Sequence, residues 1–253
     1  MPDLVTRMAP ATHVIGIDEV GRGCLMGPLA VAAVINPLGW RHAEVKDSKA
    51  IRSERKRYRI AENIVQNVVW NLVEVQPHVI NEVGISKALE SAYVMALGDI
   101  LDRRRSFASA GVCEIILDGL MMEGVYKHFH APGRVHVTAM VGADARVFES
   151  SCASLIAKAA RDKWCHDIVK SRPELAFYHV ETNKGYDSPN HTAALIQYGL
   201  SDQHRVQFCQ TRLTNEAAKR KRTLTMNLAN GSKLLIGSEP TLNSSPTPKP
   251  QGT

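Results

Sequence analysis

Apolar residues recur along the chain with two periods, one typical of strands and one typical of helices. The strand-like segments combine β-branched residues with alternation of apolar and polar positions, and Gly, Pro or Asp residues mark their ends. Five segments have this pattern: His13 to Ile17, Leu29 to Ile35, Val68 to Val75, CEIILD ending at Asp118, and GRVHVTAMVGAD ending near Asp144. Because a glycine-punctuated stretch joins the first two, we expect them to pair as antiparallel neighbours.

The segments between and after these strands have the helical spacing of apolar residues. Ser53 is expected to begin the first helix, and Pro77 is expected to begin the second. Since strands alternate with helices, the order predicts an α/β fold built on one sheet. Helices are expected in five segments: 52–66, Pro77 toward Arg105, ESSCASLIAKAARDKWCHDIVK, 188–198 and 215–227.

One domain is predicted over residues 11–232, with a helical C-terminal portion from about residue 185. A chain of 253 residues fits a single main core, because domains commonly hold roughly 100 to 200 residues. Residues 237–253 are rich in Ser, Thr and Pro and have almost nothing to bury. They are therefore predicted to form a disordered tail.

Composition indicates a globular protein and argues against several classes. Hydrophobic residues make up 44% and charged residues 22%, and no stretch approaches the roughly 18 consecutive apolar residues of a membrane span. The five cysteines are widely spaced and form no C-x-x-C pair, which argues against a disulfide framework or a zinc site. A cytoplasmic monomer without membrane association is expected, and the net charge of +6 weakly favours a polyanionic partner such as nucleic acid.

Three acidic residues, Asp18, Asp118 and Asp144, share a context, since each follows a predicted strand and precedes a small residue or a turn. Functional groups collect where the strands of an α/β sheet end, so these residues are expected to converge. Clustered carboxylates repel one another and are neutralised by hard cations such as Mg²⁺ or Mn²⁺. Glu19 would point away from Asp18 on a regular strand, so the strand is expected to bend there. The alternative is that each Asp only forms a turn.

Five sequence blocks between about Val14 and Phe208 cover most of the chain. They are GIDEVGRGCLMGPLAVAAVI, DSKAIRSERKR, IILDG, ADARVFESSCASLIAKAARD and NKGYDSPNHTAALIQYGLSDQHRVQF. In this order they resemble the type 2 ribonucleases H, specifically the bacterial ribonuclease HII family. Five ordered blocks are a specific signal, whereas a single D-E-x-G-R-G motif would be only suggestive.

The resemblance implies a ribonuclease H-like fold, a mixed β-sheet flanked by helices with a helical C-terminal portion. It implies an endonuclease that cleaves the RNA strand of RNA–DNA hybrids and incises duplex DNA 5′ to embedded ribonucleotides, leaving 3′-hydroxyl and 5′-phosphate ends, as in ribonucleotide excision repair. Carried over by position, Asp18, Glu19, Asp118 and Asp144 are the catalytic residues and the ligands of two Mg²⁺ or Mn²⁺ ions. Another nuclease of this fold, such as a resolvase or a type 1 ribonuclease H, and a catalytically inert hybrid-binding module are the alternatives.

The resemblance implies substrate contacts mainly for one glycine turn and one tyrosine. Gly21, Arg22 and Gly23 match the family's reader of the ribose 2′-hydroxyl and junction phosphate, and Tyr186 matches the tyrosine that stacks on the junction sugar. A glycine turn lets backbone groups approach the 2′-hydroxyl. Other polar residues are expected to contact the strand, with solvated lysines and packing serines as the alternative. These residues are Lys49, Lys158, Arg161, Ser151 and Ser154.

Three features depart from the family pattern. Gly142 and Asn183 stand where the family often has basic residues, which is expected to weaken phosphate contact. Residues 121–134 lengthen the connection between the last two acidic residues and are interpreted as an insertion. The histidines in and just after this segment lack the spacing of metal ligands and are expected to be ordinary surface residues.

Overall fold

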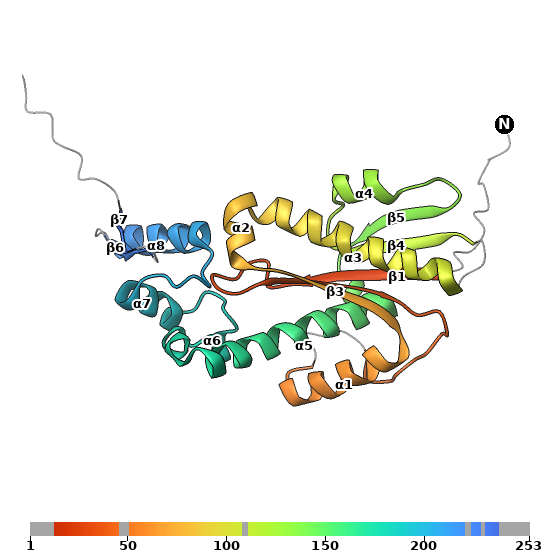
Figure 1. Ribbon diagram of the computed structural model, residues 1–253, viewed down its shortest axis with the longest axis horizontal. Helices are drawn as coiled ribbons and strands as arrows, with labels where there is room; N and C mark the ends of the chain where they lie inside the picture. Colours follow the sequence, from red (N-terminus) through yellow and green to blue (C-terminus); the bar gives the residue numbers. More distant parts are fainter. Residues whose placement is uncertain (1–12, 46–50, 108–110, 221–223, 229–230, 238–253) are drawn as a thin grey trace, which may run out of the picture.

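A computed structural model describes residues 13–45, 51–107, 111–220, 224–228 and 231–237 (Figure 1). Within them, a mixed five-stranded sheet has the strand order β3-β2-β1-β4-β5. The strands are β1 His13–Val20, β2 Leu29–Ile35, β3 Val69–Val75, β4 Cys113–Asp118 and β5 Val135–Met140. β2 pairs antiparallel with β1 and β3, whereas β4 runs parallel to β1 and β5. The predicted antiparallel pair and the predicted mixed α/β fold are both confirmed.

Helices cover both faces of the sheet, which is why β2 is buried along its whole length. Val31 and Ala33 on one face of β2 pack in the apolar core beneath α3, while Ala32 and Val34 on the other face pack beneath α1 and α5. Figure 1 shows α2 and α3 on one side of the sheet and α1 and α5 on the other. These helices are α1 Glu54–Asn67, α2 Pro77–Val83, α3 Ile85–Phe107 and α5 Phe148–Ser171.

The start of α5 lies directly against β1 at Gly16. A Cβ added at Gly16 would lie 2.1 Å from the Ser150 nitrogen, so only glycine permits this close approach. Asp18 lies two residues further along β1, on the same face of the strand. The helix therefore packs beside the strand end that carries an acidic residue.

The predicted helix starts are confirmed. The Ser53 hydroxyl accepts a hydrogen bond from a backbone N–H in the first turn of α1, and Pro77 is the first residue of α2. The helical stretch predicted from Pro77 is divided at Gly84, where φ is 81°. Because a helix requires negative φ, α2 ends there and α3 begins after it.

The connection between β4 and β5 contains α4 (Glu123–Phe129). Parallel neighbours cannot be joined by a tight hairpin and need a crossover of a dozen or more residues. Residues 121–134, interpreted above as an insertion, form most of this crossover. Their length therefore has a topological reason.

The C-terminal portion, on the left in Figure 1, is helical and ends in a two-stranded sheet. The helix predicted over 215–227 is wrong at residues 224–227, which form a strand in which Leu224 and Met226 are buried and Thr225 is exposed. This alternation lets β6 pair with β7 and close a third apolar core. The predicted tail lies, apart from Gly237, outside the described residues. The elements are η3 Pro173–Tyr178, α6 Val180–Asn183, α7 Pro189–Tyr198, α8 Val206–Arg220, β6 Leu224–Asn227 and β7 Lys233–Ile236.

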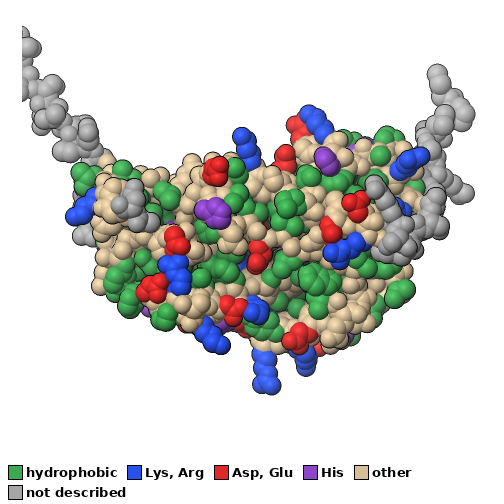
Figure 2. Space-filling view, in the orientation of Figure 1, with side chains coloured by type: hydrophobic (Ala, Val, Ile, Leu, Met, Phe, Trp, Pro, Cys, Tyr) green, Lys and Arg blue, Asp and Glu red, His purple; other side chains and the backbone are tan. Residues whose placement is uncertain are grey.

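Charge is not gathered on the face drawn in Figure 2, where acidic and basic side chains are interspersed. The net charge of +6 of the whole chain therefore gives no single-sign patch on that face. No helix in the described part of the chain is both long enough and apolar enough to cross a membrane.

Candidate active site

Asp18, Asp118 and Asp144 come together at one edge of the sheet. Asp18 lies near the end of β1, Asp118 ends β4, and Asp144 lies in η2 (Ala143–Ala145), a 3-10 turn that follows β5. Because β1, β4 and β5 are adjacent and parallel, their carboxyl ends share this edge. One carboxylate oxygen from each residue lies within 4.8 Å of the other two. The convergence expected from the sequence is found.

The carboxylate cluster is electrostatically unfavourable by itself, because two of its residues are buried and Asp118 is half-buried. Asp18 is 7% exposed and Asp144 is 2% exposed. Burial, with the nearby charges of Asp118 and Glu19, raises the pKa of Asp18 to about 7, although hydrogen bonds from Ser154 and the Glu19 N–H act to lower it. A hard divalent cation prefers such oxygen ligands and offsets their charge. The three residues therefore fit a metal, and among the described residues no histidine joins them or forms a second such group.

The 3-10 turn η2 brings Asp144 close to Asp118. The Ala143 N–H donates a hydrogen bond to Asp118 Oδ1 at 2.7 Å, which ties the end of β4 to η2. Gly142, just before η2, has a left-handed backbone with φ 72°. A basic residue would adopt this conformation less readily, so the departure at Gly142 favours the turn that carries Asp144.

Two serines on α5 form hydrogen bonds with the acidic residues. The Ser151 hydroxyl donates to the Asp144 carbonyl, and the Ser154 side chain bonds to Asp18. Both serines are buried, with 4% and 3% exposure. Their hydroxyls bond within the site and offer little surface to a ligand, and contact with a nucleic acid strand stays a prediction.

Glu19 lies on the opposite face of β1 from Asp18. The expected bend is wrong, because β1 stays paired with β2 through Val20 and its side chains continue to alternate. The Tyr93 hydroxyl on α3 donates a hydrogen bond to Glu19 Oε2, and Arg22 Nη1 lies 3.7 Å from Glu19 Oε1. Glu19 is therefore outside the group of three, although its charge still raises the pKa of Asp18.

The glycine turn after β1 is hydrogen-bonded to the C-terminal portion on one side and exposed on the other. Arg205 Nη1 donates to the Arg22 carbonyl at 3.0 Å. The Arg22 side chain is 66% exposed, and a Cβ added at Gly23 would meet nothing within 4 Å. The turn therefore offers a cation and accessible backbone to a ligand.

Tyr186 packs against this turn although it lies far away in the sequence. The Gly185 carbonyl accepts hydrogen bonds from the Leu25 and Met26 N–H groups at 2.8 and 3.2 Å. Burial raises the pKa of Tyr186 to about 12, although a hydrogen bond from the Gly21 backbone lowers it. Tyr186 remains 42% exposed, as expected for a loop residue. The glycine turn and the tyrosine therefore form one surface.

Asn183 stabilises residues 183–186, the turn that carries Tyr186 and is called the tyrosine turn below. Its amide nitrogen donates to the Tyr178 carbonyl at 2.7 Å, and its amide oxygen accepts from the Gly185 N–H at 2.8 Å. The departure at Asn183 from a basic residue thus has a local structural role.

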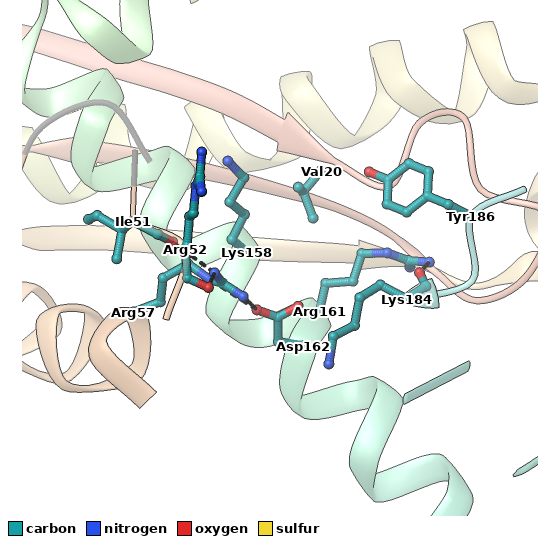
Figure 3. A pocket seen from close by; sticks show the side chains of 9 residues that line it. All are labelled: Val20, Ile51, Arg52, Arg57, Lys158, Arg161, Asp162, Lys184 and Tyr186. Atoms are coloured by element: carbon teal, nitrogen blue, oxygen red, sulfur yellow. Dashed lines mark hydrogen bonds and ion pairs between the residues drawn. The ribbon is translucent and has the colours of Figure 1, made fainter. Parts of the chain in front are cut away.

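A basic cavity of about 360 Å³ opens beside Tyr186. Figure 3 shows that the Arg52 and Lys158 side chains extend in the same direction along it, while Arg57 pairs with Asp162 at 2.5 Å between Nη2 and Oδ2. Arg52, Arg57 and Lys184 are not among the predicted site residues, although the basic run IRSERKR is a signal for the two arginines. The lining residues are Val20, Ile51, Arg52, Arg57, Lys158, Arg161, Asp162, Lys184 and Tyr186.

Arg161 has a structural role. It is 2% exposed, and its guanidinium donates to the carbonyls of Pro28, Met26 and Lys184. Because its Nη1 and Nη2 groups donate to backbone carbonyls and the side chain is buried, little of Arg161 is left to meet the substrate phosphate predicted for it. Lys49, also predicted to contact phosphate, lies outside the described residues.

Together these features define a ribonuclease H-like protein, in which helices flank a mixed sheet and carboxylates gather where its parallel strands end. Solved structures of this class share the fold. Ribonuclease H2 from Pyrococcus horikoshii matches with a TM-score of 0.61 and 22% identity, over 79% of this chain and 96% of that one. Bst-RNase HIII in complex with Mn²⁺ matches with a TM-score of 0.57 and 20% identity, over 85% and 72%.

Sequence comparison gives the family. The model of the ribonuclease HII family matches residues 15–211. Ribonuclease HII of Thermosynechococcus vestitus is 34% identical over 81% of this chain and 88% of its own length. Ribonuclease HII of Porphyromonas gingivalis is 32% identical over 76% and 87%. The chain therefore belongs to the ribonuclease HII family, as its five sequence blocks indicated, and is a metal-dependent ribonuclease.

Proposed function

We propose that this ribonuclease cleaves the RNA strand of RNA–DNA hybrids and incises duplex DNA on the 5′ side of single embedded ribonucleotides, leaving 3′-hydroxyl and 5′-phosphate ends. The observation that carries the proposal is that the carboxylates of Asp18, Asp118 and Asp144 lie together at the end of β1, the strand that leads into the glycine turn. The carboxylates supply the hydrolytic site. The glycine turn and Tyr186 supply a surface that can distinguish ribose from deoxyribose.

The proposed cofactors are two Mg²⁺ or Mn²⁺ ions. Their proposed ligands are Asp18, Asp118 and Asp144, which lie together, and Glu19, which lies outside that group. Bound there, such ions activate water and stabilise the attacking and leaving oxygens of an in-line displacement at phosphorus. The chain's own part is to concentrate and orient negative charge. The raised pKa of Asp18, about 7 in the metal-free protein, is the electrostatic signature of a site suited to a cation.

The ribonucleotide is recognised by the glycine turn in this proposal. The 2′-hydroxyl is the group that distinguishes RNA from DNA, and the open space at Gly23 leaves room for a sugar to approach the backbone. The exposed face of Tyr186 can stack on that sugar. Arg22 can bind the adjacent phosphate, and Lys158 and Lys49 add charge neutralisation that depends on salt.

Four substrates test the function in Mg²⁺ or Mn²⁺: a DNA duplex with one ribonucleotide, an RNA–DNA hybrid, an all-DNA duplex and a four-way junction. We expect cleavage of the first two only, with the nick on the 5′ side of the ribonucleotide. Cleavage of the junction alone would indicate a resolvase, and cleavage of the hybrid alone would indicate type 1 activity. Binding without cleavage would indicate an inert module. Any of these three results contradicts the proposal.

We also propose a cytoplasmic monomer that acts in ribonucleotide excision repair, with residues 11–232 as one domain. The five cysteines are free and buried, which suits a reducing compartment. Arg205 in the C-terminal portion donates to the Arg22 and Gly27 carbonyls near the N-terminus, which supports a single unit. Sedimentation gives the oligomeric state, and limited proteolysis is expected to trim the tail while leaving the domain intact.

A further inference from the structure

Two buried histidines outside the carboxylate site connect separate parts of the C-terminal portion. His191 on α7 is 0% exposed, and His204, just before α8, is 1% exposed. Their Nε2 atoms lie 3.1 Å apart. The other nitrogen of each ring also has a partner, because His204 Nδ1 meets the Ser201 N–H at 2.9 Å and His191 Nδ1 meets the Tyr186 carbonyl at 3.0 Å.

The two backbone partners fix the direction of every proton in this chain of hydrogen bonds. The Ser201 N–H can only donate, so His204 Nδ1 accepts and its proton lies on Nε2. That proton is donated to His191 Nε2, so the proton of His191 lies on Nδ1 and is donated to the Tyr186 carbonyl. Burial lowers the pKa of His204 to about 3 and lowers that of His191 as well, so both rings are neutral.

Arg205, which follows His204 in the sequence, contacts the glycine turn. Arg205 donates through Nη1 to the Arg22 carbonyl and through Nε and Nη2 to the Gly27 carbonyl, at 2.9 to 3.0 Å. Asn81 on α2 holds the segment from His204 to Val206. Its side chain donates to the His204 carbonyl and accepts from the Val206 N–H, at the start of α8. One short segment is thus bonded to both the glycine turn and the tyrosine turn.

We propose that His191 and His204 are positioning residues for Tyr186, acting through a one-directional relay of hydrogen bonds from Ser201 to the Tyr186 carbonyl. The relay fixes the tyrosine turn against the glycine turn, which Arg205 holds from the same segment. Because His191 contacts the Tyr186 backbone, the effect on the ring is indirect. The inference rests on the proposed role of Tyr186 at the ribonucleotide.

The proton positions can be measured without any activity assay. ¹⁵N NMR of the histidine rings of the full-length, metal-free protein at pH 7 distinguishes the two neutral tautomers. We expect His204 as the Nε2–H tautomer and His191 as the Nδ1–H tautomer. The opposite tautomer at either ring, or a charged ring, overturns the relay.

A matched pair of substitutions tests the functional part. His191→Asn keeps an amide donor near the Tyr186 carbonyl, whereas His191→Gln places its amide toward His204 and has no donor at the δ position. On the single-ribonucleotide duplex, we expect His191→Gln to raise KM about five- to tenfold, as for one lost buried hydrogen bond, with kcat within about twofold. We expect His191→Asn to change KM by less than about twofold. Equal effects of the two substitutions contradict the proposal.

A double-mutant cycle with Tyr186→Ala separates positioning from general destabilisation. If His191 acts through Tyr186, His191→Gln causes no further rise in KM once the ring is removed. The same rise in both backgrounds contradicts the relay. A normal KM for Tyr186→Ala itself contradicts the proposed role of the tyrosine in substrate recognition, whereas an impaired Tyr186→Ala with a normal His191→Gln contradicts the relay alone.

Discussion

The Tyr93 hydroxyl donates a hydrogen bond to the Glu19 carboxylate, on the face of β1 opposite Asp18. Tyr93 lies on α3 and is 1% exposed in the apolar core that α3 shares with the sheet. A hydroxyl buried there needs a partner. Burial, with the charge of Glu19, raises the pKa of Tyr93 well above its ordinary value. The hydroxyl therefore stays protonated and restrains one of the four acidic residues from the core side.

Tyr93→Phe is expected to weaken metal binding, because it removes the group that orients Glu19. Loss of such an orienting contact around a metal ligand typically lowers affinity about ten- to a hundredfold. Titration calorimetry with Mn²⁺ measures this directly, and cleavage should recover as the Mn²⁺ concentration is raised. Tyr58→Phe on α1 is the matched control, since the Tyr58 hydroxyl also donates to a glutamate, Glu54, at 3.1 Å. Unchanged Mn²⁺ affinity in Tyr93→Phe would show that Glu19 does not depend on this bond.

The sheet and the acidic cluster could be predicted because their signals are local. Each strand has its own alternation, and Asp118 and Asp144 follow strands whose ends meet by topology. The partner of Glu19 could not be predicted, because it depends on which helix covers which face of β1. The backbone contacts of Arg161 could not be predicted for a related reason. Irregular backbone at Met26 and Pro28 leaves carbonyls that need donors, and this need is visible only in three dimensions.

The C-terminal strands show a different limit. Leu224 and Met226 alternate with polar residues, but the strand is only four residues long and follows a helical pattern directly. So short an alternation is ambiguous until its partner β7 is known. The His191 and His204 pair was equally invisible, since two isolated histidines carry no spacing signal and meet only through the packing of α7 against the segment before α8.

Asp18→Asn is expected to stabilise the metal-free protein at neutral and alkaline pH. The unfolded carboxyl titrates near 3.8, whereas Asp18 in the folded protein titrates at about 7. Between these values the folded state holds a proton that the unfolded state has lost, so the free energy of unfolding falls as pH rises. The penalty is on the order of 4 kcal/mol above pH 7, and the Asn variant avoids it.

Urea unfolding with a chelator, from about pH 4 to pH 8, measures this difference. We expect wild type and Asp18→Asn to agree at the acidic end and to diverge as pH rises. Glu123→Gln, which changes an exposed carboxylate on α4, is the control and should show no such divergence. A variant less stable than wild type at pH 8 would contradict the electrostatic cost assigned to Asp18. Added Mn²⁺ should stabilise wild type more than the variant.

Asp118→Asn separates catalysis from binding. The Asn side chain keeps an oxygen that can accept from the Ala143 N–H, so the turn is expected to survive while the site loses one negative charge. We expect cleavage to fall by more than about a hundredfold, beyond the usual effect of changing groups around a ligand. Duplex affinity, measured by fluorescence anisotropy, should change by less than about twofold because phosphate contacts dominate it. Cleavage at the normal rate would exclude Asp118 from the site.

Lys158→Ala tests whether the basic cavity beside Tyr186 contacts the phosphate backbone. Each phosphate contact contributes close to one unit to the slope of log affinity against log salt concentration. We therefore expect Lys158→Ala to reduce that slope by about 1, uniformly across substrate sequences. Lys163→Ala is the matched control, because Lys163 lies on the same helix, is 69% exposed and pairs with Asp167. An equal change in the two slopes would mean that Lys158 acts only through net charge, and an unchanged slope in Lys158→Ala would place the strand away from the cavity.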